Sequence, residues 1–346
     1  MNDNSNLNIN ITHLVLSGGG MHGVVFVGAL RYLYLNNLHK NVTHIAGCSI
    51  GSFVGLMFAF KLQIEEMETL IYKIVSDYDL CNVPIKNYIK LVTEYGICDM
   101  ENLIIHLKNF IKYKYPNLND NVTFKDISKK FGINLYMSST NINSCENKIF
   151  SIENTPDICV FDACCASMCI PLLFKPIYID DYYYDGALTN NFPINIFDDV
   201  PCDNIIGMVL QKEERKMQKT KNISLIYILK QLFNILNKLR IKDVLIAQIN
   251  NSKIKNFYYP KNLPLDNTIN INFTRLGMKF ELKKEQIDSM IFAGFESMTE
   301  YIEDRYDKYI KKIDLDIIFS STRSTRSTRS SESSGSSEST RSSGSI

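Results

Sequence analysis

Short apolar runs and stretches of helical spacing alternate in the first part of the chain. His13 to Ser17 is an apolar run that leads into glycines, which is typical of a buried strand. Val24 to Asn36 then carries apolar residues at helical spacing. Thr43 to Ala46 repeats the strand pattern, and Ser52 to Lys61 is apolar almost all round, as in a buried helix. This order of strand, glycine turn and helix predicts a parallel sheet with helical crossovers, and so an α/β fold.

The middle of the chain continues as a mixture of helices and strands. Ile64 to Tyr115 has helical spacing in several pieces, and Asp99 is the expected N-cap of the piece from Met100 to Lys114. Thr155 followed by Pro156 predicts the start of another helix. The further predicted strands are Ile133 to Ser139, Lys148 to Ile152, Tyr178 to Tyr184 and Asn204 to Leu210.

The last part of the chain changes character. Gln211 to Lys261 holds many Lys and Arg residues and few acids around an apolar repeat, which predicts a basic amphipathic helical region. Such a region is either a surface helix packed on the core, or a lid or membrane-surface contact. Glu285 to Lys311 has the spacing of a final helix. The expected organisation is a polar arm at 1–10, one domain over 11–319 with its core at 13–210, and a disordered Ser/Thr/Arg-rich tail at 320–346.

Composition and charge narrow the class of protein. Of the 346 residues, 45% are hydrophobic and 22% are charged, the balance of an ordinary globular protein and not of a disordered one. The formal net charge is +1, so no overall field would attract nucleic acid, and we expect no nucleic-acid partner. No stretch reaches the roughly 18 consecutive apolar residues that a membrane span needs. We therefore expect no transmembrane segment and at most peripheral contact with a membrane.

The N-terminus and the cysteines point to a compartment. Met1 to Asn10 is polar and Asn-rich, without the basic start and apolar core of a signal peptide, so we expect no secretion. The nine cysteines form no disulfide framework, which favours reduced thiols in the cytoplasm. The densest group lacks the paired short spacings of a zinc site, and we expect no metal. Small core residues of a helix are the better explanation for Cys159, Cys164, Cys165 and Cys169.

A glycine-rich loop separates the first predicted strand from the first predicted helix. It consists of Gly18, Gly19, Gly20, Met21, His22 and Gly23. Consecutive glycines let backbone N–H groups point into one concavity, which binds a phosphate or the oxyanion of acyl transfer. A dinucleotide site would need an acidic residue after the next strand, where the chain has Gly47-Cys48-Ser49, and the lysine of a P-loop is also absent. On its own, the loop is equally consistent with a tight strand-to-helix turn.

The next turn matches the pattern G-x-S-x-G, with Ser49 between Gly47 and Gly51. A strand precedes it and an apolar helix follows, the context in which a strained elbow exposes a nucleophilic hydroxyl. The pattern alone is common and also describes a capped helix start. Two glycine-flanked turns in neighbouring βα units are more specific, because both lie at the carboxyl edge of a parallel sheet and converge on one site.

A nucleophilic serine needs a base. The usual chain order places a histidine after the acid, yet all five histidines lie at or before His106. The base is therefore an upstream histidine or a carboxylate. Asp185 follows a predicted strand; Asp-Gly is an ordinary turn, but a carboxylate there within reach of Ser49 would accept its proton. His22 either touches an oxyanion or phosphate, or is an exposed turn residue.

Together these motifs resemble the patatin-like phospholipase family. Gly18 to Gly23 resembles its oxyanion loop, Gly47 to Gly51 its nucleophile elbow, and Asp185-Gly186-Ala187 its Asp-Gly-Gly/Ala motif. Ala166 to Pro171 resembles its Ala-Ser-x-Ala-x-Pro segment, and Asn190, Asn191 and Pro193 its Asn-x-Pro. The resemblance runs from about His13 to Pro193. The chain departs from the family at His22, where Arg or Lys is frequent, and at Cys169, which replaces an alanine.

The resemblance implies a three-layer α/β/α fold with a mostly parallel central sheet and a Ser49–Asp185 dyad without histidine. It also implies phospholipase A-type hydrolysis of fatty acyl esters through an acyl-enzyme on Ser49, with Asp185 as base, oxyanion binding by the glycine loop, and no cofactor. Phospholipid or another acyl ester is the expected substrate. Alternatives are a carboxylesterase, lysophospholipase or acyltransferase acting on other acyl groups, and a non-enzymatic lipid- or nucleotide-binding module.

Overall fold

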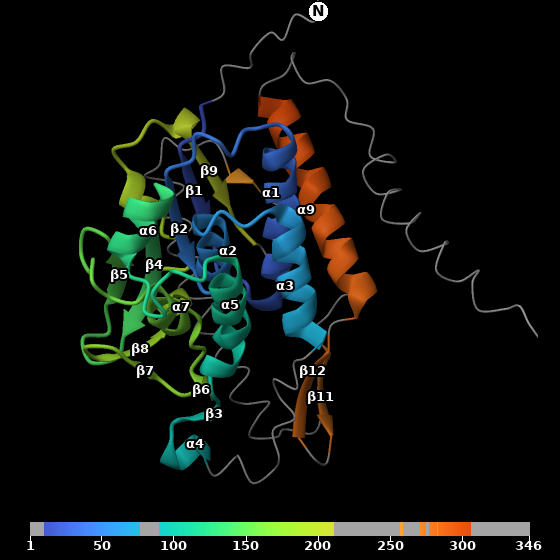
Figure 1. Cartoon of the computed structure of the whole chain (residues 1–346). Helices are drawn as coiled ribbons and strands as arrows, with labels where there is room; N and C mark the ends of the chain where they lie inside the picture. The colour runs from blue at the N-terminus through green and yellow to red at the C-terminus, as the bar shows by residue number, and fades with distance from the viewer. Residues whose placement is uncertain are drawn as a thin grey trace, which may run out of the picture.

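A computed structural model describes residues 10–76, 90–210, 257–258, 270–274, 277–281 and 283–305. The predicted polar arm, basic amphipathic region and Ser/Thr/Arg-rich tail lie outside these residues, apart from Asn10 and the pair 257–258. A central sheet carries α-helices packed on one face (Figure 1). Within the part of the chain that the structure describes, no helix is long and apolar enough to cross a membrane.

The central sheet has the strand order β10-β9-β1-β2-β4-β8-β7, with β5 also paired to β4. The half from β10 to β4 is parallel, and the half in which β5, β8 and β7 join β4 is antiparallel. The predicted parallel sheet with crossovers is therefore confirmed for the first half of a mixed sheet. Its strands are β1 (His13–Leu16), β2 (His44–Cys48), β4 (Asn134–Asn141), β5 (Asn147–Ser151), β7 (Ile177–Tyr178), β8 (Tyr182–Asp185), β9 (Ile205–Met208) and β10 (Phe257–Tyr258).

The remaining described elements surround this sheet. Two small ladders pair β3 (Gly96–Cys98) with β6 (Leu172–Phe174) and β11 (Asn270–Thr274) with β12 (Gly277–Glu281). The α-helices are α1 (Val24–Leu35), α2 (Ile50–Ala59), α3 (Ile64–Ser76), α4 (Lys90–Thr93), α5 (Glu101–Lys114), α6 (Phe124–Phe131), α7 (Val160–Met168) and α9 (Lys284–Arg305). The 3-10 turns are η1 (Gly20–Gly23), η3 (Gly186–Leu188), η4 (Ile194–Phe197) and η5 (Cys202–Asn204).

Both faces of the parallel strands are buried. In β1, Leu14 and Leu16 face the helical layer, whereas Val15 faces the opposite side, where Phe197 of η4 and Phe192 just before it cover the strand. All three β1 side chains are 0% exposed, which explains why this strand is a continuous apolar run in the sequence. The 3-10 turns thus supply the described part of the third layer.

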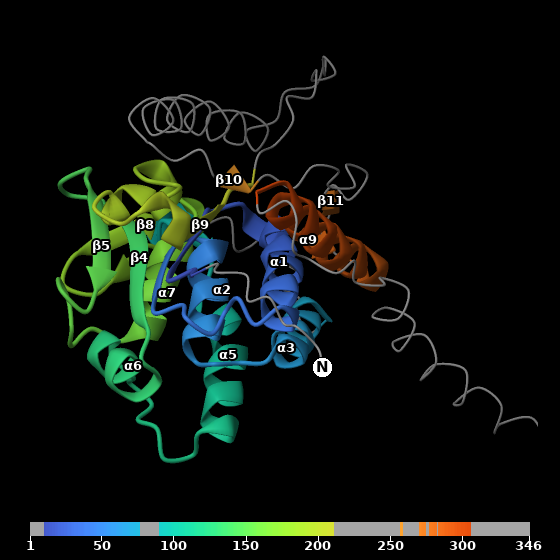
Figure 2. The same ribbon diagram turned by 90° about the horizontal axis from the view of Figure 1, so that it is seen from above.

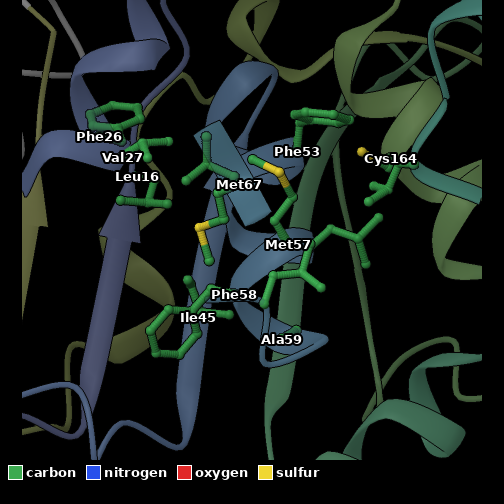
Figure 3. Packing of buried hydrophobic residues seen from close by; sticks show 14 of the residues in the cluster. Leu16, Phe26, Val27, Ile45, Phe53, Met57, Phe58, Ala59, Met67 and Cys164 are labelled. Carbon is green, nitrogen blue, oxygen red and sulfur yellow. The ribbon is translucent and has the colours of Figure 1, made fainter. Parts of the chain in front are cut away.

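The main core lies between the sheet and the helices (Figure 3). Phe53, Met57, Phe58 and Ala59 of α2 are each at most 3% exposed. They pack in one cluster with side chains of β1, β2, α1, α3 and α7. The prediction that this helix is apolar because it is buried all round is confirmed. Because α2 is packed on all sides, its first turn, which directly follows Ser49, is held in place.

Helices α1 and α9 lie side by side although they are far apart in the sequence (Figure 2). A Cβ atom at Gly28 would stand 1.8 Å from the Ile291 carbonyl oxygen, and one at Gly294 would stand 2.0 Å from that of Val25. Only glycine permits this backbone contact. The predicted final helix is confirmed from Lys284 to Arg305, and its predicted end at Lys311 lies outside the described residues.

Three local predictions were wrong. Helix α5 begins after Met100, because the Asp99 carboxylate pairs with the Lys175 ammonium at 3.1 Å instead of capping the helix. Helix α7 begins at Val160, since the Thr155 hydroxyl bonds to the backbone of Ser151 in a turn. The predicted single strand from 178 to 184 is a hairpin of β7 and β8 with its turn between them.

Candidate active site

Ser49 occupies a strained turn between β2 and α2. Its φ of 53° and ψ of −125° place a non-glycine residue in the left-handed half of conformational space. Such a conformation costs about 1–3 kcal/mol and persists only where the surroundings enforce it. A Cβ atom at Gly47 would lie 2.5 Å from the Ser52 nitrogen, and one at Gly51 would lie 2.3 Å from the Leu16 carbonyl oxygen. The turn therefore has no room for a Cβ atom at either glycine of the motif.

The fold brings Ser49 and Asp185 together. Strand β4 joins them, because it pairs with β2 at Cys48 through Ser138 and with β8 at Asp185 through Ser139. The Ser49 Oγ donates a hydrogen bond of 2.6 Å to Asp185 Oδ2. Both residues are buried, at 5% and 3% exposure. Two side chains that the sequence analysis singled out thus form one buried pair.

The Asp185 carboxylate is held in place from several directions. Its Oδ1 accepts the Ala187 backbone N–H at 2.8 Å and the Cys48 thiol at 3.8 Å. Its backbone N–H donates to the Cys169 carbonyl at 2.8 Å, and its own carbonyl accepts the Thr140 hydroxyl at 2.9 Å. These contacts leave Oδ2 directed at Ser49.

Burial raises the pKa of Asp185 from 3.8 to about 6, while the hydrogen bonds from Ser49, Ala187 and Cys48 hold it down. The carboxylate is therefore ionised at neutral pH and more basic than an exposed aspartate. Burial, together with the adjacent Asp185 charge, raises the pKa of the Cys48 thiol well above its usual range. Cys48 stays protonated beside Ser49 and is not a competing nucleophile.

The glycine loop runs along the serine turn. The Gly18 N–H donates to the Asn191 carbonyl at 3.1 Å, and a Cβ atom at Gly18 would stand 3.2 Å from Ser49 Cβ. At the far end, a Cβ atom at Gly23 would stand 2.3 Å from Ile50 Cγ1. Gly20 has a φ of 59°, which glycine adopts without strain. The loop therefore packs directly against the serine turn, as expected for neighbouring βα units.

Histidines begin the strands that end at this site. His13 and His44 open β1 and β2, and their rings stack with centroids 4.4 Å apart at the opposite edge of the sheet from Ser49. His39 stacks on Tyr34 just beyond the end of α1. These three histidines are therefore too far along their elements to act as a base for Ser49. None of these three histidines therefore supports the alternative in which an upstream histidine is the base.

Some contacts of the site were missed from the sequence. Cys48 as a hydrogen-bond partner of Asp185, and Ser167, which accepts the Ser49 N–H at 3.0 Å, were not singled out. The only sequence signal for Ser167 was its place in the family-like segment from 166 to 171.

This chain is similar to known proteins in sequence and in fold. A sequence model described as patatin-like phospholipase matches residues 14–198. A probable lipid hydrolase of Invertebrate iridescent virus 6 is 36% identical over 189 residues, which cover 53% of this chain and 62% of that protein. An uncharacterized protein of Acanthamoeba polyphaga mimivirus is 29% identical over 294 residues, covering 84% of this chain and 94% of that protein.

Among solved structures, VipD from Legionella pneumophila has a similar fold. The superposition gives a TM-score of 0.52 at 17% identity and covers 85% of this chain and 67% of that one. The family match spans more than half of the chain and includes Ser49 and Asp185. The chain therefore belongs to the patatin-like phospholipase family.

Proposed function

We propose that this protein is a lipid hydrolase of phospholipase A type, with Ser49 as nucleophile and Asp185 as its only acid–base partner. The observation that carries the proposal is the hydrogen bond of 2.6 Å from Ser49 Oγ to a buried carboxylate, at a turn held in a strained conformation. Membership of the patatin-like phospholipase family makes a lipid acyl ester the favoured substrate.

The proposed reaction has two halves. Asp185 takes the proton of the Ser49 hydroxyl as Oγ attacks the acyl carbonyl. The resulting oxyanion accepts hydrogen bonds from backbone N–H groups of the glycine loop. Because the Gly18 N–H is already bound to Asn191, we assign this donation to the loop residues after it, Gly19 to Met21. The alcohol, a lysophospholipid, leaves with the proton held by Asp185. Water then attacks the acyl-enzyme and gives a proton to Asp185, which passes it to the departing Ser49 Oγ as the fatty acid is released.

Two further parts of the proposal rest on sequence pattern alone. These are peripheral contact with a lipid surface through 211–261, which lies almost wholly outside the described residues, and a cytoplasmic location. Hydrolysis or transfer of other acyl groups is the competing proposal, since the motifs specify acyl transfer and not the head group. A binding module without chemistry would have no use for a strained serine hydrogen-bonded to a buried base.

The test combines two variants with a phospholipid panel and a fluorophosphonate probe. We expect Ser49→Ala to lose both fatty acid release and covalent labelling. Asp185→Asn, which keeps the shape of the side chain, should lower the rate about 100- to 10,000-fold, the usual contribution of a general base. Asp199→Asn, at an exposed aspartate beyond η4, is the matched control and should retain the wild-type rate.

Each outcome decides one point. A near-wild-type rate in Asp185→Asn would show that the dyad assignment is wrong. Labelling of the wild type without fatty acid release from any phospholipid, but with cleavage of neutral or short esters, would favour the carboxylesterase alternative. Appearance of the acyl chain on an added alcohol would favour an acyltransferase. Ligand-stabilised folding without any labelling would leave only the binding module.

A further inference from the structure

Ser167 lies near the C-terminal end of α7, directly against the serine turn. It is 0% exposed. Its hydroxyl oxygen accepts the Ser49 backbone N–H at 3.0 Å, lies 2.8 Å from the Ser52 hydroxyl, and lies 2.6 Å from the Ser138 carbonyl oxygen. The Ser167 hydroxyl thus contacts the turn after β2, the first turn of α2, and β4.

The directions of these hydrogen bonds follow from the number of protons. A carbonyl oxygen only accepts, so the single proton of the Ser167 hydroxyl goes to Ser138. The Ser52 hydroxyl must then donate to Ser167, which accepts from Ser49 and from Ser52 with its two lone pairs. The Ser167 oxygen is therefore fully bonded, with one proton donated and two accepted, and it cannot rotate without breaking a buried bond.

The same segment also holds the other half of the pair. Two residues after Ser167, the Cys169 carbonyl accepts the backbone N–H of Asp185 at 2.8 Å. The end of α7 thus binds the backbone of Ser49 through a side chain and the backbone of Asp185 through the main chain. This short segment therefore connects the backbones that carry Ser49 Oγ and Asp185 Oδ2.

We propose that Ser167 is a positioning residue that holds Ser49 in its strained conformation and so keeps its hydroxyl aligned with Asp185. This inference rests on the proposed function. The strain at Ser49 needs compensation, and the bond from its own N–H to Ser167 is a direct source of it. Loss of the Ser167 hydroxyl leaves that N–H and the Ser52 hydroxyl unpaired in the interior, so the turn relaxes toward an unstrained geometry.

The central experiment replaces Ser167 by Ala. A displacement of about 1 Å at a reacting group costs up to about 100-fold in rate, so we expect kcat to fall about 10- to 100-fold. KM should stay unchanged, because Ser167 is 0% exposed and so offers no surface for a substrate to contact. Ser52→Ala removes a neighbour of Ser167 but keeps the acceptor for Ser49, and it should lose less than Ser167→Ala.

The matched control is Cys164→Ala. Cys164 is also 0% exposed and lies on α7 one turn before Ser167, and its thiol lies 3.7 Å from the Met168 sulfur. Its replacement removes one buried side-chain atom from the same helix without touching the Ser167 bonds. We expect wild-type kinetics from this variant.

A structural role is separated from positioning by active-site titration with a fluorophosphonate. Positioning predicts that all Ser167→Ala molecules are labelled eventually, but that the labelling rate per site falls. A smaller labelled fraction with an unchanged rate per site would mean that Ser167 only supports folding, and the proposal would be overturned. If Ser167→Ala does not fold, Ser167→Cys replaces the acceptor by a weak one at similar volume and must show the same slow labelling.

Ser49→Ala in the same series distinguishes the two levels of inference. If Ser49→Ala retains labelling or hydrolysis, the proposed function itself is wrong. If Ser49→Ala is silent while Ser167→Ala labels at the wild-type rate per site, the proposed function stands and the role of Ser167 is wrong.

Discussion

At the scale of single residues, the proposed role of Asp185 as the base would make the reaction depend on pH. Burial raises its pKa to about 6, and only the ionised form accepts the Ser49 proton. We therefore expect kcat/KM to be constant at neutral pH and to fall as the pH drops through about 6. The measurement is a profile of kcat/KM between about pH 4 and pH 8 with a soluble, uncharged ester. A midpoint near 4 would mean that the carboxylate behaves as an exposed one.

The raised pKa of Asp185 also affects stability, but here a rise in pH is unfavourable. The folded-state pKa of about 6 lies above the ordinary 3.8, so the folded protein binds the Asp185 proton more tightly than the unfolded chain. The resulting stabilisation is complete below about pH 4 and is lost as the pH rises through about 6. At about 1.4 kcal/mol per pKa unit, the buried charge costs up to about 3 kcal/mol at neutral pH.

Asp185→Asn should therefore inactivate the protein and stabilise it at neutral pH. The amide carries no charge, and it still offers an oxygen to the Ala187 N–H. Urea unfolding at pH about 7.5 should give a higher midpoint than the wild type, and the difference should disappear near pH 4. Asp199→Asn, at an exposed position, should show no such change. A lower midpoint for Asp185→Asn at both pH values would contradict this reasoning.

Single residues differ in how far the sequence predicts them. Ser49 and its flanking glycines were predictable, because a tight strand-to-helix turn has local requirements that leave a short motif. Asp185 was a candidate base because it follows a predicted strand, but its choice over an upstream histidine came from the family resemblance and the distribution of histidines. Ser167 was not predicted, because its bond to Ser49 joins residues 118 apart and depends on how α7 packs on α2.

At the scale of elements, the contact between α1 and α9 depends on glycine. The space for a Cβ atom is missing at Gly28 and Gly294, where backbone carbonyls would stand at 1.8 and 2.0 Å. Gly28→Ala and Gly294→Ala should each lower the free energy of unfolding by about 1–3 kcal/mol. Gly55→Ala on buried α2 is the control, since its nearest neighbour would be at an ordinary 3.5 Å and alanine favours a helix. It should leave the urea midpoint unchanged or raise it.

Elements were predictable where their pattern is local. Apolar periodicity identified α1, α2 and α9, and short apolar runs identified the parallel strands β1, β2, β4 and β9. The parallel strand β10 was not identified, because Phe257 and Tyr258 fall in the stretch predicted to be helical. The hairpin of β7 and β8 and the late start of α7 were missed, because tyrosines and a Thr-Pro pair fit more than one local structure and tertiary contacts decide among them. The pairing of α9 with α1 was equally invisible, since a glycine in a helix does not indicate which helix approaches it.

At the scale of the whole molecule, the family match and the folded unit have different limits. The match ends at 198, yet α9 contributes a further apolar face to the main core. The side chains that it adds to the main core are Ile287, Met290, Ile291, Phe295, Met298 and Ile302, each at most 4% exposed. They cover α1, the helix that directly follows the glycine loop. We therefore propose that the hydrolase domain includes α9, as the expected domain over 11–319 requires.

Truncation tests this domain boundary. Each buried apolar side chain of α9 contributes about 1.5–3 kcal/mol to the free energy of unfolding. The loss of six such side chains would remove most or all of the roughly 5–15 kcal/mol by which a typical domain is stable. A chain that ends at residue 282 should lose its cooperative urea transition and its ester hydrolysis. A chain that ends at 319 keeps α9 and removes only the Ser/Thr/Arg-rich tail, so both should match the full chain. If the chain ending at 282 unfolded at the full-length midpoint, α9 would lie outside the hydrolase domain, and its close contact with α1 would not be needed to hold the glycine loop beside Ser49.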